Sequence, residues 1–143
     1  MSKIQTALFV LIMMAIGGLL VVFWMLFYPY KTVEIYPEAM PIIGAEFHQG
    51  DIIPYQVEIC KYTEAKALIR YTFINDIMIP LSPKVSDVPV GCHKGVNKTV
   101  TVPMNAPAGK YFLMIDLEYK VNPLRTIYKS YTSDEFVVVD KTE

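Results

Sequence analysis

An uncharged run of 22 residues, 7–28, constrains this chain more than any other feature of its sequence. As a helix it would be about 33 Å long at 1.5 Å per residue, which matches the hydrocarbon core of a bilayer. A helix on the surface of a globular protein carries a polar stripe where it meets water, and this run has none. The run therefore predicts a transmembrane helix.

The flanks of this run indicate where the helix lies and that it stays attached. The run is too long for the apolar part of a cleavable signal peptide, and its exit, residues 24–31, lacks a small-x-small cleavage site. Pro29 ends the helix, and Trp24, Tyr28 and Tyr30 suit the membrane interface. We predict a tail at 1–6 and a membrane helix at 7–30.

Gly17 and Gly18 interrupt the bulky side chains of the predicted helix. Small residues let two membrane helices approach closely, although the G-x-x-x-G spacing is absent here. The pair predicts lateral packing against a second copy or another membrane helix.

Basic residues are almost balanced across the helix, with Lys3 before it and Lys31 after it, so they barely decide its orientation. A six-residue tail is easily left in the cytoplasm, and two cysteines are compatible with an oxidising compartment. We expect a single-pass protein with a cytoplasmic N-terminus and its folded domain outside, whether periplasmic, extracellular or virion-exposed.

Beyond the helix the apolar residues alternate with polar ones, which is the period of β-strands. An approach segment, 31–45, holds an edge strand at 32–36, and the domain follows at 46–143. The longest irregular stretch is a loop at 82–95. The predicted strands of the domain are 53–59, 67–74, 77–81, 96–102, 110–121, 126–131 and 136–139. About seven short strands without a helical period predict an all-β fold, an antiparallel β-sandwich.

Three segments resemble an immunoglobulin-like or fibronectin type III-like domain: 100–103 (VTVP), 106–111 (APAGKY) and 136–139 (FVVV), within a region of 46–140. The resemblance implies that Tyr111 forms a tyrosine corner at the start of the penultimate strand. Antibody-type domains carry a cysteine two residues later, where this chain has Leu113, so the family's inter-sheet disulfide is absent.

A short anchor followed by one such domain also resembles small membrane-anchored proteins, of unassigned activity, that are frequent in bacteriophage and bacterial sequences. The segments that carry this likeness are 59–62 (ICKY) and 121–126 (VNPLRT). The likeness implies no particular activity.

The two cysteines, Cys60 and Cys92, predict a disulfide that ties a strand to the 82–95 loop. A copper site built from Cys92, His93 and His48 is the alternative. Adjacent ligands cannot easily bind one tetrahedral ion, and no C-x-x-C pair is present. We therefore expect no metal and no other cofactor.

The sequence offers no catalytic constellation. It has no G-x-S-x-G elbow, and Asp116 and Glu118 fall on the wet face of a strand, where charge is ordinary. Neither an enzyme nor a small-molecule substrate is expected. Residues 32–143 hold 11 basic and 14 acidic residues, a net charge of −3, which argues against a nucleic-acid partner.

Three apolar residues remain on faces that should meet water: Phe112, Met114 and Tyr128. Such a patch indicates a partner surface. The sequence thus predicts a membrane-anchored structural or interaction protein that binds a protein partner, associates with itself or joins a membrane-associated assembly such as a virion. A copper-handling accessory protein outside the cytoplasm is the alternative.

Overall fold

The computed structural model describes residues 3–36, 39–44 and 46–140, and it begins with one long helix, α1 (Lys3–Phe27). None of the helix residues is buried, and the helix is long and apolar enough to cross a membrane. It ends at Phe27, two residues before Pro29, whereas the predicted membrane segment extended to residue 30. It begins earlier than predicted, because residues 3–6 continue the helix instead of forming a tail. The rest of that tail and the last residues of the 46–143 domain lie outside the described residues.

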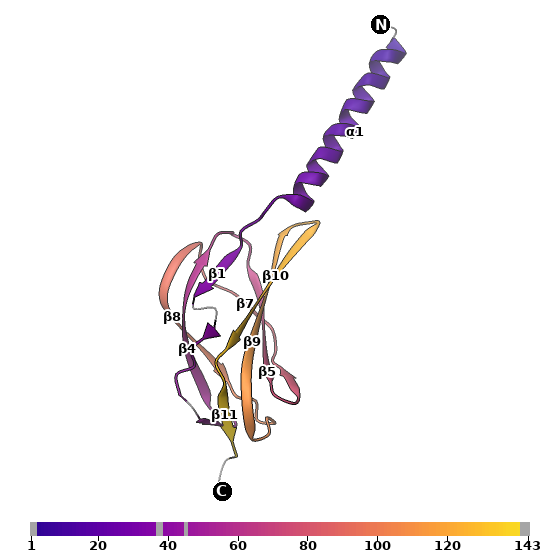
Figure 1. Cartoon of the computed structure of the whole chain (residues 1–143). Coiled ribbons are helices and arrows are strands. Elements are labelled where there is room, and N and C mark those ends of the chain that lie inside the picture. The colour runs from indigo at the N-terminus through magenta and orange to yellow at the C-terminus, as the bar shows by residue number, and fades with distance from the viewer. Residues whose placement is uncertain (1–2, 37–38, 45, 141–143) are drawn as a thin grey trace.

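After the helix, all regular secondary structure of the described residues is β-strand (Figure 1). They are β1 (Val33–Tyr36), β2 (Ala39–Met40), β3 (Glu46–His48), β4 (Ile52–Lys61), β5 (Ala67–Ile74), β6 (Met78–Pro80), β7 (Lys84–Val85), β8 (Gly91–Thr101), β9 (Gly109–Asn122), β10 (Arg125–Ser133) and β11 (Phe136–Val139).

The strands form two sheets. The smaller has the order β1-β4-β8. In the larger sheet, one edge of β9 pairs with β5, and its other edge pairs with both β10 and β11 at successive positions. β6 and β7 pair with the far edge of β5. In Figure 1 the helix leaves from one end of the β domain and the C-terminus lies near the other.

The predicted mostly-β fold with one leading helix is confirmed, and three details were wrong. The described part has eleven strands, where the sequence predicted an edge strand and about seven others, because β2, β3 and β7 are too short to show a period. Two pairings, β2 with β10 and β3 with β11, are parallel, so the fold is not purely antiparallel. The predicted 82–95 loop contains β7 and the start of β8.

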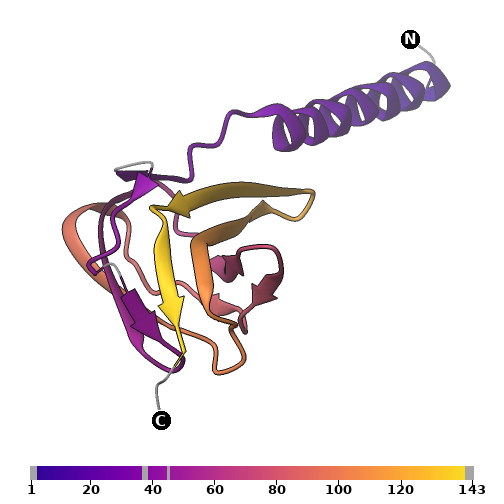
Figure 2. The ribbon, with the colours of Figure 1, turned by 60° about the horizontal axis from the view of Figure 1, so that its bottom comes forward.

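β10 and β11 pair with the same edge of β9, and a corner in the chain separates them (Figure 2). Ser133, which is buried, fills the gap that the corner leaves in the ladder. Its hydroxyl accepts a hydrogen bond from the Leu113 backbone N–H at 2.9 Å and donates one to the Asp134 carbonyl at 2.8 Å. The hydroxyl therefore satisfies a buried amide that would otherwise lack a partner.

The core between the sheets holds an aromatic cluster of Phe47, Phe73, Tyr111 and Phe136. The ring centroids of Phe136 lie 5.9 Å from those of Phe47 and Phe73 in edge-to-face contacts, which are favourable for aromatic quadrupoles. These four residues come from β3, β5, β9 and β11, so their contacts hold together strands of the larger sheet that are far apart in the sequence.

Two buried phenols, Tyr55 on β4 and Tyr71 on β5, join the two sheets by a hydrogen bond of 3.1 Å between their hydroxyl oxygens. Burial raises the pKa of Tyr55 well above its usual range, and the neighbouring Tyr71 adds to this shift. This hydrogen bond therefore links the two sheets inside the core.

Tyr111 anchors the loop before β9. Its side chain is fully buried, and its hydroxyl donates to the Pro107 carbonyl at 2.9 Å. Replacing Tyr111 by phenylalanine keeps the ring and leaves this carbonyl without that donor. We expect about 1–2 kcal/mol less stability, measured by denaturant unfolding of the full chain in detergent. Tyr128→Phe, at an exposed position, is the control and should change nothing measurable.

Candidate functional site

The larger sheet turns one face away from the core, and we call the side chains of β5, β6, β9 and β10 on this side the outer face. The strand register places its members in rows across the sheet. All three predicted partner residues, Phe112, Met114 and Tyr128, lie on this face. Phe112 and Met114 alternate with the buried residues of β9, and Tyr128 is opposite Glu118, which has the same parity as they do. The structure thus brings them onto one surface.

The apolar residues of the outer face gather in two rows, which we call the distal cluster. Met78, Ile74 and Phe112 form the first row, and Met114 continues the patch in the next. Met78 is 71% exposed and Phe112 is 40% exposed. The cluster lies toward the start of β9, which is the end of the strand remote from the hairpin that meets the helix.

Charged and polar side chains separate Tyr128 from the distal cluster. Arg70 pairs with Glu118 at 2.7 Å, and Ser130 donates to Asp116 at 2.5 Å. Tyr128 is opposite Glu118, six positions from Phe112 along β9, which corresponds to roughly 20 Å. The three predicted residues therefore form two groups, and only Phe112 and Met114 belong to one patch.

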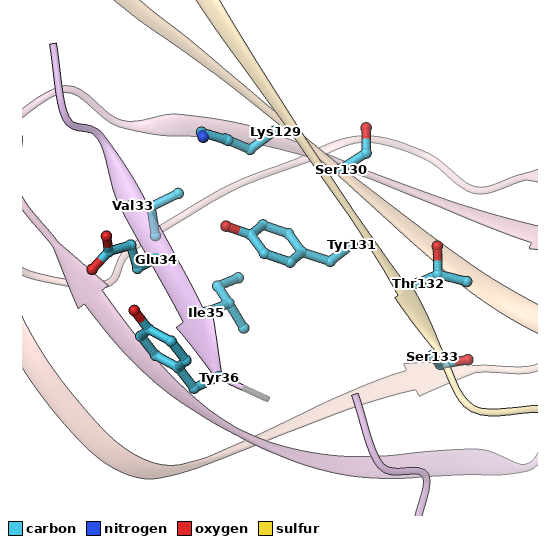
Figure 3. Close-up of a pocket in the computed structure, with 9 residues that line it drawn as sticks. All are labelled: Val33, Glu34, Ile35, Tyr36, Lys129, Ser130, Tyr131, Thr132 and Ser133. Atoms are coloured by element: carbon cyan, nitrogen blue, oxygen red, sulfur yellow. The ribbon is translucent and has the colours of Figure 1, made fainter. Parts of the chain in front are cut away.

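A groove of about 640 Å³ runs between β1, at the edge of the smaller sheet, and the end of β10 (Figure 3). Tyr131 points across it toward Val33 and Ile35, while Ser130 and Thr132 point away. Lys129 lies opposite the buried Leu117, so it carries a charge at an inward-facing position of a sheet edge. Such a charge discourages another strand from pairing there.

The end of α1 meets the hairpin between β9 and β10. The Asn122 side chain donates to the Met25 carbonyl at 2.8 Å, and Arg125 donates to the Tyr28 carbonyl at 2.5 Å. The Arg125 guanidinium also lies 5.8 Å from the centroid of the Tyr30 ring. The last carbonyls of a helix lack partners within the helix, so these side chains cap it from a segment almost 100 residues away.

The predicted interface aromatics lie at this same junction. The rings of Trp24 and Tyr28 are 4.3 Å apart between centroids, and Tyr30 contacts Tyr28 at 4.9 Å. Next to them Lys31 pairs with Glu34 at 2.9 Å, and this hydrogen bond lowers the pKa of Glu34 and raises that of Lys31. Aromatic and charged groups thus meet where the helix ends.

The predicted disulfide between Cys60 and Cys92 is present, but it does not tie a strand to a loop. The two residues are directly opposite each other on the neighbouring strands β4 and β8. Their sulfur atoms are bonded to each other and are not available as thiolate ligands. Within the described residues, no group of three or more His, Cys, Asp or Glu side chains is placed to hold a metal.

The two histidines of the copper alternative lie on separate strands. His48, at the end of β3, has its Nδ1 3.3 Å from Asp51, and His93, on β8, has its Nε2 3.2 Å from the Pro89 carbonyl. Each ring thus has a local partner. The copper alternative stays an untested prediction.

The predicted helix-packing residues, Gly17 and Gly18, lie on the exposed surface of α1. A Cβ added at either position would meet nothing within 4 Å. The space beside them is open for a second helix, and the packing prediction remains to be tested.

Sequence reasoning missed Lys61, which is 4% exposed and donates from Nζ to the Val88 carbonyl at 2.9 Å. The alternation of β4 contained the signal, since position 61 has the same parity as the inward residues from Ile53 to Ile59. It also missed Asn122 and Arg125 as helix caps, because nothing local to a turn indicates what lies beside it.

No protein-family model matches the chain, and no curated protein is found to match it.

Proposed function

We propose that this chain is a single-pass membrane protein that displays an immunoglobulin-like β-sandwich outside the cytoplasm and binds a protein partner through the distal cluster. In this role it acts without catalysis, as an interaction or assembly component at the membrane.

The topology supports the immunoglobulin-like part of the proposal. The chain contributes β1 to the smaller sheet and then β2 and β3 to the larger one, where they pair in parallel with the closing strands β10 and β11. The hydrogen bond from Tyr111 to the Pro107 carbonyl, four residues upstream, has the form of a tyrosine corner.

The position of the domain outside the cytoplasm is supported by the Cys60–Cys92 disulfide. Disulfides persist in oxidising compartments and are rare in the cytosol. A cytoplasmic N-terminus and one crossing by α1 would place the β domain in such a compartment.

The distal cluster is the observation that carries the binding proposal. It groups large apolar side chains on a sheet face that should be wet, and the Arg70–Glu118 pair and Asp116 border it. An apolar centre with a polar rim is the usual arrangement of a protein interface. The cluster is also remote from the membrane end of β9, so a partner would reach it without meeting the bilayer.

The test replaces Phe112 and Met114 together by serine in the full-length protein. We expect the double variant to lose the partners that co-purify with the wild type after cross-linking in intact membranes, while denaturant unfolding shows the fold intact. The lost binding energy resides in these side chains because buried aromatic and apolar anchors dominate interfaces.

The matched control is Ile52→Ser with Met104→Ser, which also removes two exposed apolar side chains, from β4 and from the 103–108 loop. This control should keep the partners. Equal co-purification by both double variants would contradict the proposal. An adduct of twice the mass of the chain, lost in the Phe112 and Met114 variant, would identify the partner as a second copy.

A further inference from the structure

We propose that the turn between β9 and β10, residues 122–125, is a second membrane contact, in which Leu124 enters the interfacial layer of the same bilayer that α1 crosses. The inference rests on the proposed function only in requiring that α1 spans a bilayer. It adds that the β domain touches the membrane surface instead of hanging from a loose tether.

The depth of the turn is fixed by two hydrogen bonds. Asn122 binds the carbonyl of Met25, inside the last turn of α1, and Arg125 binds the carbonyl of Tyr28, just past its end. Residues 24–28 are also where the aromatic side chains suited to the interface lie. The turn therefore sits at the level of the headgroup layer, which is only about 5–8 Å thick on each side of the hydrocarbon core.

The composition of the turn fits that layer. Its two tip residues, Pro123 and Leu124, are exposed, and Leu124 is 52% exposed. A single exposed leucine needs no explanation elsewhere on a protein. Here the Asn122 side-chain oxygen already accepts from the Leu124 N–H, so turn chemistry is satisfied by Asn122 and gives no reason for leucine over a polar residue.

Charge beside the turn complements a lipid surface. A hollow of about 280 Å³ next to the helix end is lined by Lys31, Arg125 and Lys129, with Glu34 as its one acid. Glu34 is already paired with Lys31. The surplus of basic side chains faces the level where lipid phosphates lie, and basic residues near an anionic leaflet are attracted to it.

The experiment measures tryptophan fluorescence, and because the chain has a single tryptophan, the signal of each protein comes from one position. The full-length protein is placed in bilayer nanodiscs whose lipids are brominated near the carbonyl end of the acyl chains, which quench nearby tryptophans. Three proteins are compared: the native chain with Trp24, the Trp24→Phe Leu124→Trp variant, and the Trp24→Phe Met104→Trp variant. Met104 is 75% exposed and lies before β9, roughly 40 Å from the turn along that strand.

We expect the tryptophan at 124 to lose emission in brominated lipid to an extent comparable with Trp24 and to emit at shorter wavelength than the one at 104, which should not be quenched. If Trp24 is quenched but the tryptophan at 124 behaves like the one at 104, the membrane contact is wrong while the transmembrane helix stands. If Trp24 itself is not quenched, α1 does not span the bilayer, and both the inference and the proposed function fail.

Discussion

Replacing Phe136 by alanine is expected to destabilise the β domain by about 3–5 kcal/mol, the range measured for large-to-small changes at buried phenylalanines. Phe136 is 1% exposed, and its ring contacts those of Phe47, Phe73 and Tyr111. Truncation would leave a cavity among three rings on different strands, which cannot all move inward to fill it. The loss would be a large share of the 5–15 kcal/mol typical of a domain.

The measurement is the midpoint of denaturant unfolding of the full chain in detergent, followed by tyrosine fluorescence and circular dichroism. Val137→Ala is the matched control, since Val137 is the next residue on β11, has the opposite parity and is only half-buried. It should cost about 1 kcal/mol or less. If the two variants unfold at the same midpoint, Phe136 does not fill the core position assigned to it.

Removing the disulfide is expected to cost about 3–4 kcal/mol on the chain-entropy model, given the separation of 32 residues between Cys60 and Cys92. The closed segment contains β5, β6 and β7, so the bond restricts the unfolded chain over three strands. Cys92 is exposed and Cys60 half-buried, so alanine at both positions removes little packing. The double variant Cys60→Ala Cys92→Ala isolates the effect of the cross-link.

The control for this prediction is chemical reduction. In the presence of a thiol reductant, the wild type should unfold at nearly the same denaturant concentration as the double alanine variant, because both then lack the cross-link. Without reductant the wild type should be the more stable of the two. A difference below about 1 kcal/mol under oxidising conditions would show that the unfolded chain gains little from losing the bond.

Local pattern determined much of this protein. The absence of charge over 7–28 predicted α1, because a helix without a polar face cannot lie on a soluble surface. Along β9 the alternation predicted the inward side chains, and Tyr111, Leu113, Ile115, Leu117 and Tyr119 are all buried. Each of these features depends on residues that are neighbours in the chain.

Pairing between distant segments decided the rest. The start of β8 showed no period, because Gly91, Cys92 and Lys94 are exposed and this stretch is a strand only by its register with β4. The same register places Cys92 opposite Cys60. Alternation put Phe112 and Tyr128 on wet faces, but only the order β5-β9-β10 made these one face and inserted charged rows between them.

The junction at the membrane shows the same division. The sequence determined a helix with aromatic residues at its exit, and strands that end at 121 and resume at 126, since both follow from local composition. That Asn122 caps Met25, and Arg125 caps Tyr28, was decided only by the tertiary structure, because a hydrogen bond across 97 residues leaves no trace in either segment alone.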